Sequence, residues 1–513
     1  MSKLFSILAL ITVLFLSPMS HADNQMTETF LNDLDYLHEV GGDIYCYWDL
    51  KKEMDGVDWD ELYEEARSQM TSATTIKGYY TILRKMIAGV HDGHVNISML
   101  KNQLSNPYYL PLRFKEVEGN KIVISAIKTG AFIDQPPFTL GDQVVAMNDI
   151  PIEDVITDWQ QYMSGSTEQL RRFYTIKFMH NWPPYNEPPM SNSILTIKDG
   201  GTTRKVEVPW IIYDYNDDPT YKMEEYRINE DVEAKILPGN IGYLRVSAMY
   251  APVDEKYIPY IRSQMEKLLN TDGLIIDVRN NGGGWGEVGD AIISYLIDEP
   301  KIRYKASPRM SPQLLYARPH FYSAFEADFE NDPLFAKWKD FIIEPAPKEL
   351  RYKGEVITLI NSKCFSACDT FADSIASNKL SKMMGTPTGG GTGYPMYIEM
   401  PSGMSVARFS TTRGYSNFGR LLEGTGTIPD IYARLTNDDI RNRRDSVLMS
   451  AYEMLLGDNQ LTKSHSLKNA VTYSYSGKKE LVFFPLADEE ILPQNIEEER
   501  LINLSSHEFD ELW

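Results

Sequence analysis

Apolar and polar positions change their period twice along the chain. Up to about residue 100, apolar side chains recur every three or four residues, which is typical of helices with one buried face. This spacing predicts helices over 27–39, 59–70 and 75–89. Asp58 and Thr74 precede the second and third of them and are expected N-caps. We therefore place an N-terminal helical domain at residues 26–100.

From about residue 105 the period becomes two, as in half-buried strands. Predicted strands near 110–117 and 121–127 precede Gly-Asp-Gln-Val-Val-Ala-Met-Asn (141–148), a helix over 153–162 and a hairpin over 193–208. This order resembles a PDZ-like domain, which we place at 105–213; an unrelated small β domain stays open as the alternative. Residues 164–189 interrupt the pattern as an insertion.

The third part alternates buried strands with helices. Strands are predicted at 242–246, 273–279 and 355–360, and helices at 253–270, 287–297 and 366–378. Such alternation indicates an α/β fold in which helices cover a largely parallel sheet. We place this core at 227–457 with an aromatic insertion at 300–350, after a polar linker near 214–226 and before an acidic extension at 458–513.

The first residues predict export. Lys3 precedes an apolar run, Leu4 to Leu16, which is too short to span a bilayer, and small residues follow at Ser20 and Ala22. We expect a signal peptide over 1–22 and a periplasmic or secreted protein; a buried N-terminal helix is the alternative. No later run reaches about 18 apolar residues, so no integral membrane segment is expected after cleavage.

The composition disfavours some classes of partner but does not indicate a substrate. The chain has 42% hydrophobic and 24% charged residues, as globular proteins do, and its net charge of −21 disfavours nucleic acids and anionic membranes as partners. Three cysteines are too few for a disulfide scaffold. Two of them, Cys364 and Cys368, flank Ser366; we favour two buried free thiols, with a local bridge left open. No ligand-spaced Cys or His pair stands nearby, so no metal is expected.

Ser366 is the first candidate for chemistry. An apolar strand ends at Ile360, a short turn follows, and a helix begins near this serine. A hydroxyl at a strand-to-helix turn is exposed above the sheet, where the first helical N–H groups and the helix dipole favour developing negative charge. The alternative is a serine that only caps the helix.

A second element is the glycine run Gly282 to Gly284, which follows the buried strand and Asn-Asn. Unobstructed backbone N–H groups at positive φ suit an oxyanion hole. We expect the Ala367 N–H and one from Gly283 or Gly284 to be the donors, each contributing roughly 3 kcal/mol. No Gly-Lys-Ser/Thr or Gly-x-Gly-x-x-Gly pattern is present, so no nucleotide cofactor is expected.

These segments together resemble the C-terminal processing (tail-specific) and tricorn family of serine peptidases. The resemblance rests on Leu-Ile-Ile-Asp-Val-Arg-Asn-Asn-Gly-Gly-Gly (274–284) followed by Ser-Ala-Cys-Asp (366–369). It also covers the segments 91–94, 385–391, 401–403 and 423–430. It implies a crotonase (ClpP)-like core after a PDZ-like domain, with Ser366 as the nucleophile.

The resemblance also implies which base serves the serine. One branch of the family carries a Lys after the nucleophile, but Gly391 stands at that place. The tricorn-like branch uses a His near the end of the helical region and a Glu before the final Pro-Asp, and His94 and Glu423 match these places. The resemblance implies that Glu423 acts on His94 directly or through another side chain. Alternatively, His91 and His94 could form a surface turn or, with Asp92, a metal site; we expect His91 to be structural.

We expect a serine-type endopeptidase or carboxy-terminal processing peptidase that acts on peptides or unfolded proteins. The PDZ-like domain would gate entry or hold a substrate C-terminus by strand addition. Two alternatives stay open: a non-catalytic protein that holds apolar ligands on the same fold, like the interphotoreceptor retinoid-binding proteins, and an esterase. With an ordinary histidine pKa, activity would fall below about pH 6. A homo-oligomer is compatible with the sequence.

Overall fold

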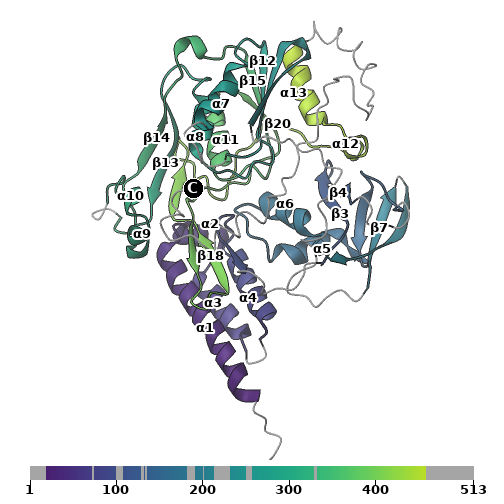
Figure 1. Ribbon diagram of the computed structural model, residues 1–513, viewed down its shortest axis with the longest axis vertical. Coiled ribbons are helices and arrows are strands. Elements are labelled where there is room, and N and C mark those ends of the chain that lie inside the picture. The colour runs from purple at the N-terminus through teal and green to yellow at the C-terminus, as the bar shows by residue number, and fades with distance from the viewer. Residues whose placement is uncertain are drawn as a thin grey trace, which may run out of the picture.

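The computed structural model describes residues 19–71, 74–99, 108–128, 132, 136–181, 191–199, 201–212, 232–249, 257–327 and 332–457 (Figure 1). Most of the predicted signal peptide, the linker near 214–226 and the acidic extension at 458–513 lie outside these residues. Within the described ranges, no helix has the length and apolar character needed to cross a membrane.

Four helices form the N-terminal region: α1 (Met19–Ile44), α2 (Trp48–Asp55), α3 (Trp59–Gln69) and α4 (Ile76–Ala88). Asp58 caps α3 as predicted, because its side chain accepts from the N–H groups of Asp60 and Glu61. Thr75, not Thr74, caps α4 through the Gly78 N–H. Helix α2 was not predicted from the sequence; it is a short helix whose buried residue is Lys51.

The helical region completes its core with residues from far along the chain. Strand β1 (Asn96–Met99) pairs antiparallel with β18 (Ser405–Phe409), which in turn pairs with β17 (Met396–Glu399). Phe409 and Ile398 from these strands share one buried cluster with Leu34 and Leu83 of the helices. The ring centroids of Phe409 in β18 and Trp59 in α3 lie 5.9 Å apart, and Figure 1 shows β18 beside the helical region.

The second region is a small β domain beside the helices. Its main sheet runs β3-β4-β5-β7-β8, and β6 pairs with β5. The elements are β2 (Tyr108–Tyr109), β3 (Leu112–Val117), β4 (Lys121–Ile127), β5 (Gln143–Met147), β6 (Ile150–Pro151), α5 (Ile152–Gln160), α6 (Glu168–Phe178), β7 (Ser193–Asp199), β8 (Thr202–Val208) and β9 (Ile211–Ile212).

The predicted insertion at 164–189 contains helix α6, which the sequence did not reveal. Ile176 and Met179 pack with Leu112 and Phe114 of β3 in the buried core of this domain. The Leu110 N–H donates to the His180 carbonyl at 2.7 Å. The segment that follows α6 is therefore hydrogen-bonded to the residues just before β3.

The third region holds the largest sheet, in the order β10-β11-β12-β15-β16-β20. All neighbours are parallel except the edge strand β10. The strands are β10 (Val232–Leu237), β11 (Ile241–Val246), β12 (Gly273–Asp277), β15 (Glu355–Ile360), β16 (Lys382–Gly385) and β20 (Ile431–Tyr432). The helices are α7 (Tyr257–Glu266), α8 (Gly286–Ile293), α11 (Ala367–Ser377), α12 (Asn437–Asn442) and α13 (Ser446–Leu456).

Both faces of this sheet are buried, as continuous apolar strands require. Leu274 and Ile276 of β12 face the cluster that includes α7, α8 and α11. Ile275, between them, faces the cluster of α13 on the opposite side. The predicted α/β layering is therefore present, and the carboxyl ends of β12 and β15 bring the glycine run and the serine turn to one edge.

The predicted insertion at 300–350 is structured. It contains β13 (Lys301–Pro308), α9 (Pro312–Ala317), α10 (Pro319–Tyr322), β14 (Lys339–Ile343) and a short 3-10 turn (Lys348–Leu350). Strand β13 pairs with β14 and with β19 (Thr412–Tyr415). Leu314 of α9 packs into the core of the helical region, so the insertion joins that region to the large sheet.

Candidate active site

Ser366 lies in a strained turn between β15 and α11. It occupies the N-cap position of α11 with φ 61° and ψ −121°, and its side chain makes no capping hydrogen bond. Its N–H donates to the Gly391 carbonyl at 3.0 Å. A non-glycine residue in such a conformation costs on the order of 1–3 kcal/mol, which the surrounding fold must offset. The Ser366 hydroxyl therefore does not cap α11, which was the alternative prediction for this residue.

The structure brings His94 to this hydroxyl. Nε2 of His94 lies 2.9 Å from Oγ of Ser366, although the two residues are 272 positions apart. The ring packs against Phe365, with 4.5 Å between ring centroids, and Arg408 donates to the His94 carbonyl at 2.8 Å. Burial lowers the pKa of His94 to about 3, with the nearby Asp92 charge opposing and Arg408 assisting. The imidazole is thus neutral and able to accept a proton.

Asp92 is the acidic residue beside His94. Its Oδ1 accepts the His94 backbone N–H at 2.6 Å and lies 3.9 Å from Nδ1 of the same residue. Its Oδ2 accepts from the hydroxyls of Tyr45 (3.0 Å) and Ser410 (2.8 Å). Sequence reasoning considered Asp92 only as part of a turn or a metal site. Its place two residues before His94 was the available signal.

Glu423 lies near Asp92 and His94, but it makes no hydrogen bond or ion pair with the His94 imidazole. Its carboxylate is 1% exposed, and Oε1 lies 2.9 Å from Nζ of the fully buried Lys51. Burial, and secondly the charge of Asp92, raise the pKa of Glu423 to about 8, while Lys51 and the Ser166 hydroxyl oppose the shift. The side chain is therefore linked to the His91–His94 loop through a lysine that the sequence did not indicate.

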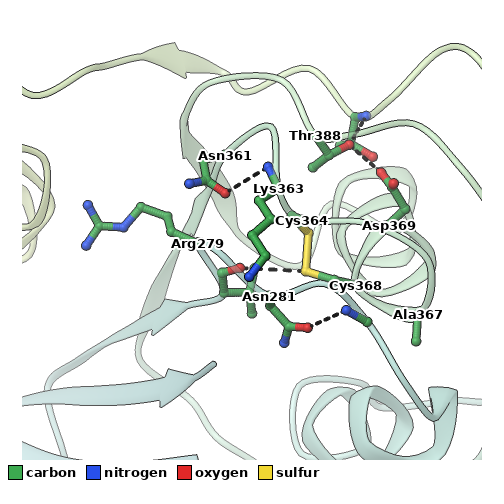
Figure 2. The surroundings of a disulfide bond; sticks show 12 residues. Arg279, Asn281, Asn361, Lys363, Cys364, Ala367, Cys368, Asp369 and Thr388 are labelled. Carbon is green, nitrogen blue, oxygen red and sulfur yellow. Dashed lines mark hydrogen bonds between the residues drawn. A yellow bond between two sulfur atoms is a disulfide. The ribbon is translucent and has the colours of Figure 1, made fainter. Parts of the chain in front are cut away.

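The predicted oxyanion donors lie around Ser366. A Cβ at Gly283 would fall 2.6 Å from the Phe365 carbonyl and 2.7 Å from the Ser366 Cβ, so only glycine fits here. The Gly283 N–H, however, donates to Asn281 Oδ1 at 2.8 Å (Figure 2). Gly284 follows with φ 128°. Ala367 is the first residue of α11, where an N–H has no intrahelical acceptor.

The expectation of two free thiols beside the serine is wrong, because Cys364 and Cys368 form a disulfide. Cys364 precedes α11 and Cys368 lies in its first turn, so the two do not share one regular helix. The turn at Ser366 brings their Cα atoms to 5.2 Å, within the range for a bridge. Figure 2 shows the bridge between the end of the turn and the start of the helix.

Two buried acidic residues, Asp369 and Asp277, support the surrounding loops. Asp369 accepts from the Thr388 hydroxyl and from the Gly391 N–H at 3.0 Å. Burial raises its pKa to about 7. Asp277 binds Arg279 at 2.7 Å, and Arg279 also binds Asp445 at 2.6 Å. The Asp277–Arg279 ion pair fixes the end of β12. It makes no hydrogen bond or ion pair with Ser366.

The segment that leads into α6 also reaches the site. Ser166 Oγ accepts the Gly93 N–H at 2.9 Å, and Thr167 Oγ1 donates to the Gly389 carbonyl at 2.9 Å. A Cβ at Gly391 would lie 2.3 Å from the Phe365 ring and 2.7 Å from Ser166 Oγ. Gly391, which stands where the resemblance places the lysine of the Ser-Lys branch, therefore has no room for a side chain.

Comparisons with known proteins agree with this architecture. Residues 240–433 match the family model for peptidase family S41, and residues 106–215 match that for a PDZ domain. An uncharacterized protein of Chlamydia muridarum (strain MoPn / Nigg) is 29% identical over 126 residues, which are 24% of this chain and only 20% of that relative.

Two crystal structures share the fold at low identity. Mature CPAF complexed with lactacystin has a TM-score of 0.68 at 17% identity, covering 86% of this chain and 100% of that chain. Mature CPAF itself has a TM-score of 0.67 at 16% identity, covering 86% and 98%. The predicted fold, an α/β crotonase-like core after a PDZ domain and a helical region, is confirmed.

Proposed function

We propose that this chain cleaves peptide bonds through an acyl-enzyme on Ser366, because residues 240–433 match the model of peptidase family S41, whose members are serine peptidases and hence hydrolases. The observation that carries the proposal is the 2.9 Å contact between Nε2 of His94 and Oγ of Ser366. A serine hydroxyl becomes a competent nucleophile when a base at this distance accepts its proton.

In the proposed reaction, neutral His94 takes the hydroxyl proton as Oγ of Ser366 bonds to the substrate carbonyl carbon. The resulting imidazolium gives that proton to the leaving amine, which leaves the acyl-enzyme. A water molecule then repeats the sequence and releases the acid. Asp92 would stabilise the imidazolium, because its carboxylate is the acidic group nearest Nδ1 at 3.9 Å.

The oxyanion would be held by the N–H groups of Ala367 and Gly284. The reason to prefer Gly284 over Gly283 is that Asn281 already accepts the Gly283 N–H. Backbone donors fixed in this way need no reorganisation during the reaction, which makes each of them worth roughly 3 kcal/mol.

We also propose that the enzyme belongs to the histidine-dependent, tricorn-like branch of the family. The support is the position of His94 at the hydroxyl, together with the closely packed surroundings of Gly391. Lys363 and Lys382 lie closer to Ser366 in the sequence than Gly391 does. Neither is needed as a base when an imidazole already occupies that place.

The substrates we propose are peptides or unfolded proteins, and the site of action is outside the cytoplasm. The apolar run before Ala22 supports export. The Cys364–Cys368 bridge supports it too, because disulfides persist in oxidising compartments. N-terminal sequencing of protein purified from the source cells tests this: a mature terminus at Asp23 is expected, and an intact Met1 would contradict it.

A fluorophosphonate probe tests the catalytic assignment. We expect the purified protein to be labelled at Ser366, as located by peptide mass spectrometry, and labelling to disappear in Ser366→Ala and His94→Gln. Labelling that survives Ser366→Ala, or a folded His94→Gln that is labelled at the wild-type rate, would overturn the assignment. A folded Lys363→Met that loses labelling would move the base to that lysine.

Turnover of a peptide library then separates a peptidase from an esterase. Labelled protein that hydrolyses p-nitrophenyl esters but cleaves no peptide in the library would favour an esterase. A protein that takes no probe at all would favour the non-catalytic, ligand-holding alternative.

A further inference from the structure

Lys51 is a buried cation that the proposed mechanism does not use. It lies in α2, and its side chain is 0% exposed. Nζ is 2.9 Å from Oε1 of Glu423, 2.5 Å from the carbonyl oxygen of His91 and 3.4 Å from Oδ2 of Asp55. One ammonium group therefore joins the carboxylate of Glu423 to the backbone of the loop that carries His94.

The acidic residues around Lys51 keep its side chain protonated. A buried ammonium ordinarily loses its proton, but Glu423, Asp92 and Asp55 together outweigh the effect of burial and raise the pKa of Lys51. The other titratable side chain on this loop is His91, whose pKa burial lowers to about 4, so it adds no charge near pH 7. Removing one partner of a buried ion pair leaves the other uncompensated, which is strongly destabilising locally.

Two backbone contacts transmit the position of this pair to the serine. The residue after Glu423, Gly424, donates to the Gly390 carbonyl at 2.7 Å. The neighbouring Gly391 carbonyl accepts the Ser366 N–H. At the other end, His91 is three residues from His94. Lys51 thus connects the loop that carries the base with the loop that supports the nucleophile.

We propose that Lys51 is a positioning residue: it binds the Glu423 carboxylate and the His91 carbonyl, and so keeps the His94 imidazole against Ser366. This inference rests on the proposed peptidase function and adds a residue to it. It also explains how Glu423 can affect His94 although the carboxylate does not contact the imidazole. Glu423 acts on His94 through Lys51 and the loop.

Lys51→Met tests the proposal, because methionine keeps most of the chain length and removes the charge and the donors. Lys52→Met is the matched control, since Lys52 is the next residue of α2 and pairs at the surface with Asp58 at 2.7 Å. We expect the second-order rate of fluorophosphonate labelling at pH 7 to fall at least tenfold in Lys51→Met. It should stay within twofold of wild type in Lys52→Met.

A double-mutant cycle separates positioning from general damage. Glu423→Gln alone should also lower the labelling rate at least tenfold. The Lys51→Met, Glu423→Gln double variant should be no slower than the slower single variant, because both changes break one linkage. In Lys51→Met, the lysine no longer lowers the Glu423 pKa, so the limb of the labelling profile that follows the ionisation of Glu423 should move to higher pH. A purely structural loss would leave that limb in place.

The proposal is overturned if folded Lys51→Met is labelled at the wild-type rate, or if the rate losses of the two single variants multiply in the double variant. If Lys51→Met does not fold, Lys51→Gln, which keeps a donor for the His91 carbonyl, is judged by the same rule. If wild-type protein takes no probe, the peptidase proposal itself fails. The Lys51–Glu423 coupling is then measured from the thermal unfolding midpoints of wild type, the two single variants and the double variant. Additive midpoint shifts would show that the two side chains are not coupled.

Discussion

Removing the Cys364–Cys368 bridge is expected to slow the chemistry of Ser366 without unfolding the protein. The bridge closes around the nucleophile, because the two cysteines are four positions apart and Ser366 stands between them. Ser366 has φ 61°, a conformation that a serine leaves readily unless its neighbours hold it. Replacing both cysteines with alanine removes this constraint and does not require a reductant to reach two buried sulfur atoms.

The size of the effect follows from the size of the ring. Chain-entropy estimates give about 2 kcal/mol for a loop this short, against about 3 kcal/mol for a 15-residue loop. If all of that free energy is lost from the turn at Ser366, the active conformation becomes about 30-fold less populated. The remaining contacts of the turn, such as Ser366 N–H to the Gly391 carbonyl, retain part of the order. We therefore expect labelling to slow by about 3- to 30-fold.

The assay is the second-order rate of fluorophosphonate labelling at pH 7 for wild type, Cys364→Ala, Cys368→Ala and the double variant. Each single change breaks the same bridge, so all three variants should slow to a similar extent. Cys46→Ala is the control, because Cys46 is a buried free cysteine outside the bridge. Thiol counting by mass spectrometry after alkylation in denaturant verifies the bridge in wild type. Variants labelled within twofold of wild type would refute the reasoning.

Three further outcomes are expected. Because burial holds the His94 pKa near 3, the imidazole stays neutral down to that pH, so labelling should persist at pH 5 and not fall below about pH 6. A half-maximal rate near pH 6.5 would contradict this. Gly283→Ala should abolish labelling, because its Cβ would lie 2.6 Å from the Phe365 carbonyl, whereas Gly282→Ala, whose Cβ meets nothing closer than 3.9 Å, should keep it. Equal labelling rates in the two variants would refute this steric argument. Gly391→Lys should inactivate the protein, because the side chain has no room beside Phe365, and a gain of labelling in a His94→Gln background would show otherwise.

Periodicity and local motifs predicted the parts of the structure that depend on neighbouring residues. The buried strands at 273–279 and 355–360 appear as β12 and β15, because β-rich apolar runs bounded by turns leave few alternatives. The fold class followed from the alternation of strands and helices. His94 could be paired with Ser366 only through the family resemblance, because no local pattern relates residues 272 positions apart.

The features that the sequence did not reveal are those that depend on distant contacts. A lysine in a short polar helix is expected at the surface, so Lys51 gave no sign of the buried Glu423 that binds it. Helix α6 lies in a stretch set among prolines and polar residues, and its burial depends on strand β3. The disulfide was misjudged because the spacing of the two cysteines does not fix their distance, whereas the turn at Ser366 brings their Cα atoms to 5.2 Å.

The pairing of β1 with β18 has a consequence for biosynthesis. A chain emerging from the ribosome has its four N-terminal helices and His94 long before residues 405–409, which complete their sheet and core. The base and the nucleophile are therefore brought together only after nearly the whole described chain has been made. On the proposed function, a chain assembled in this order lacks its active site while it is still incomplete, and unfinished copies do not digest one another or the proteins around them.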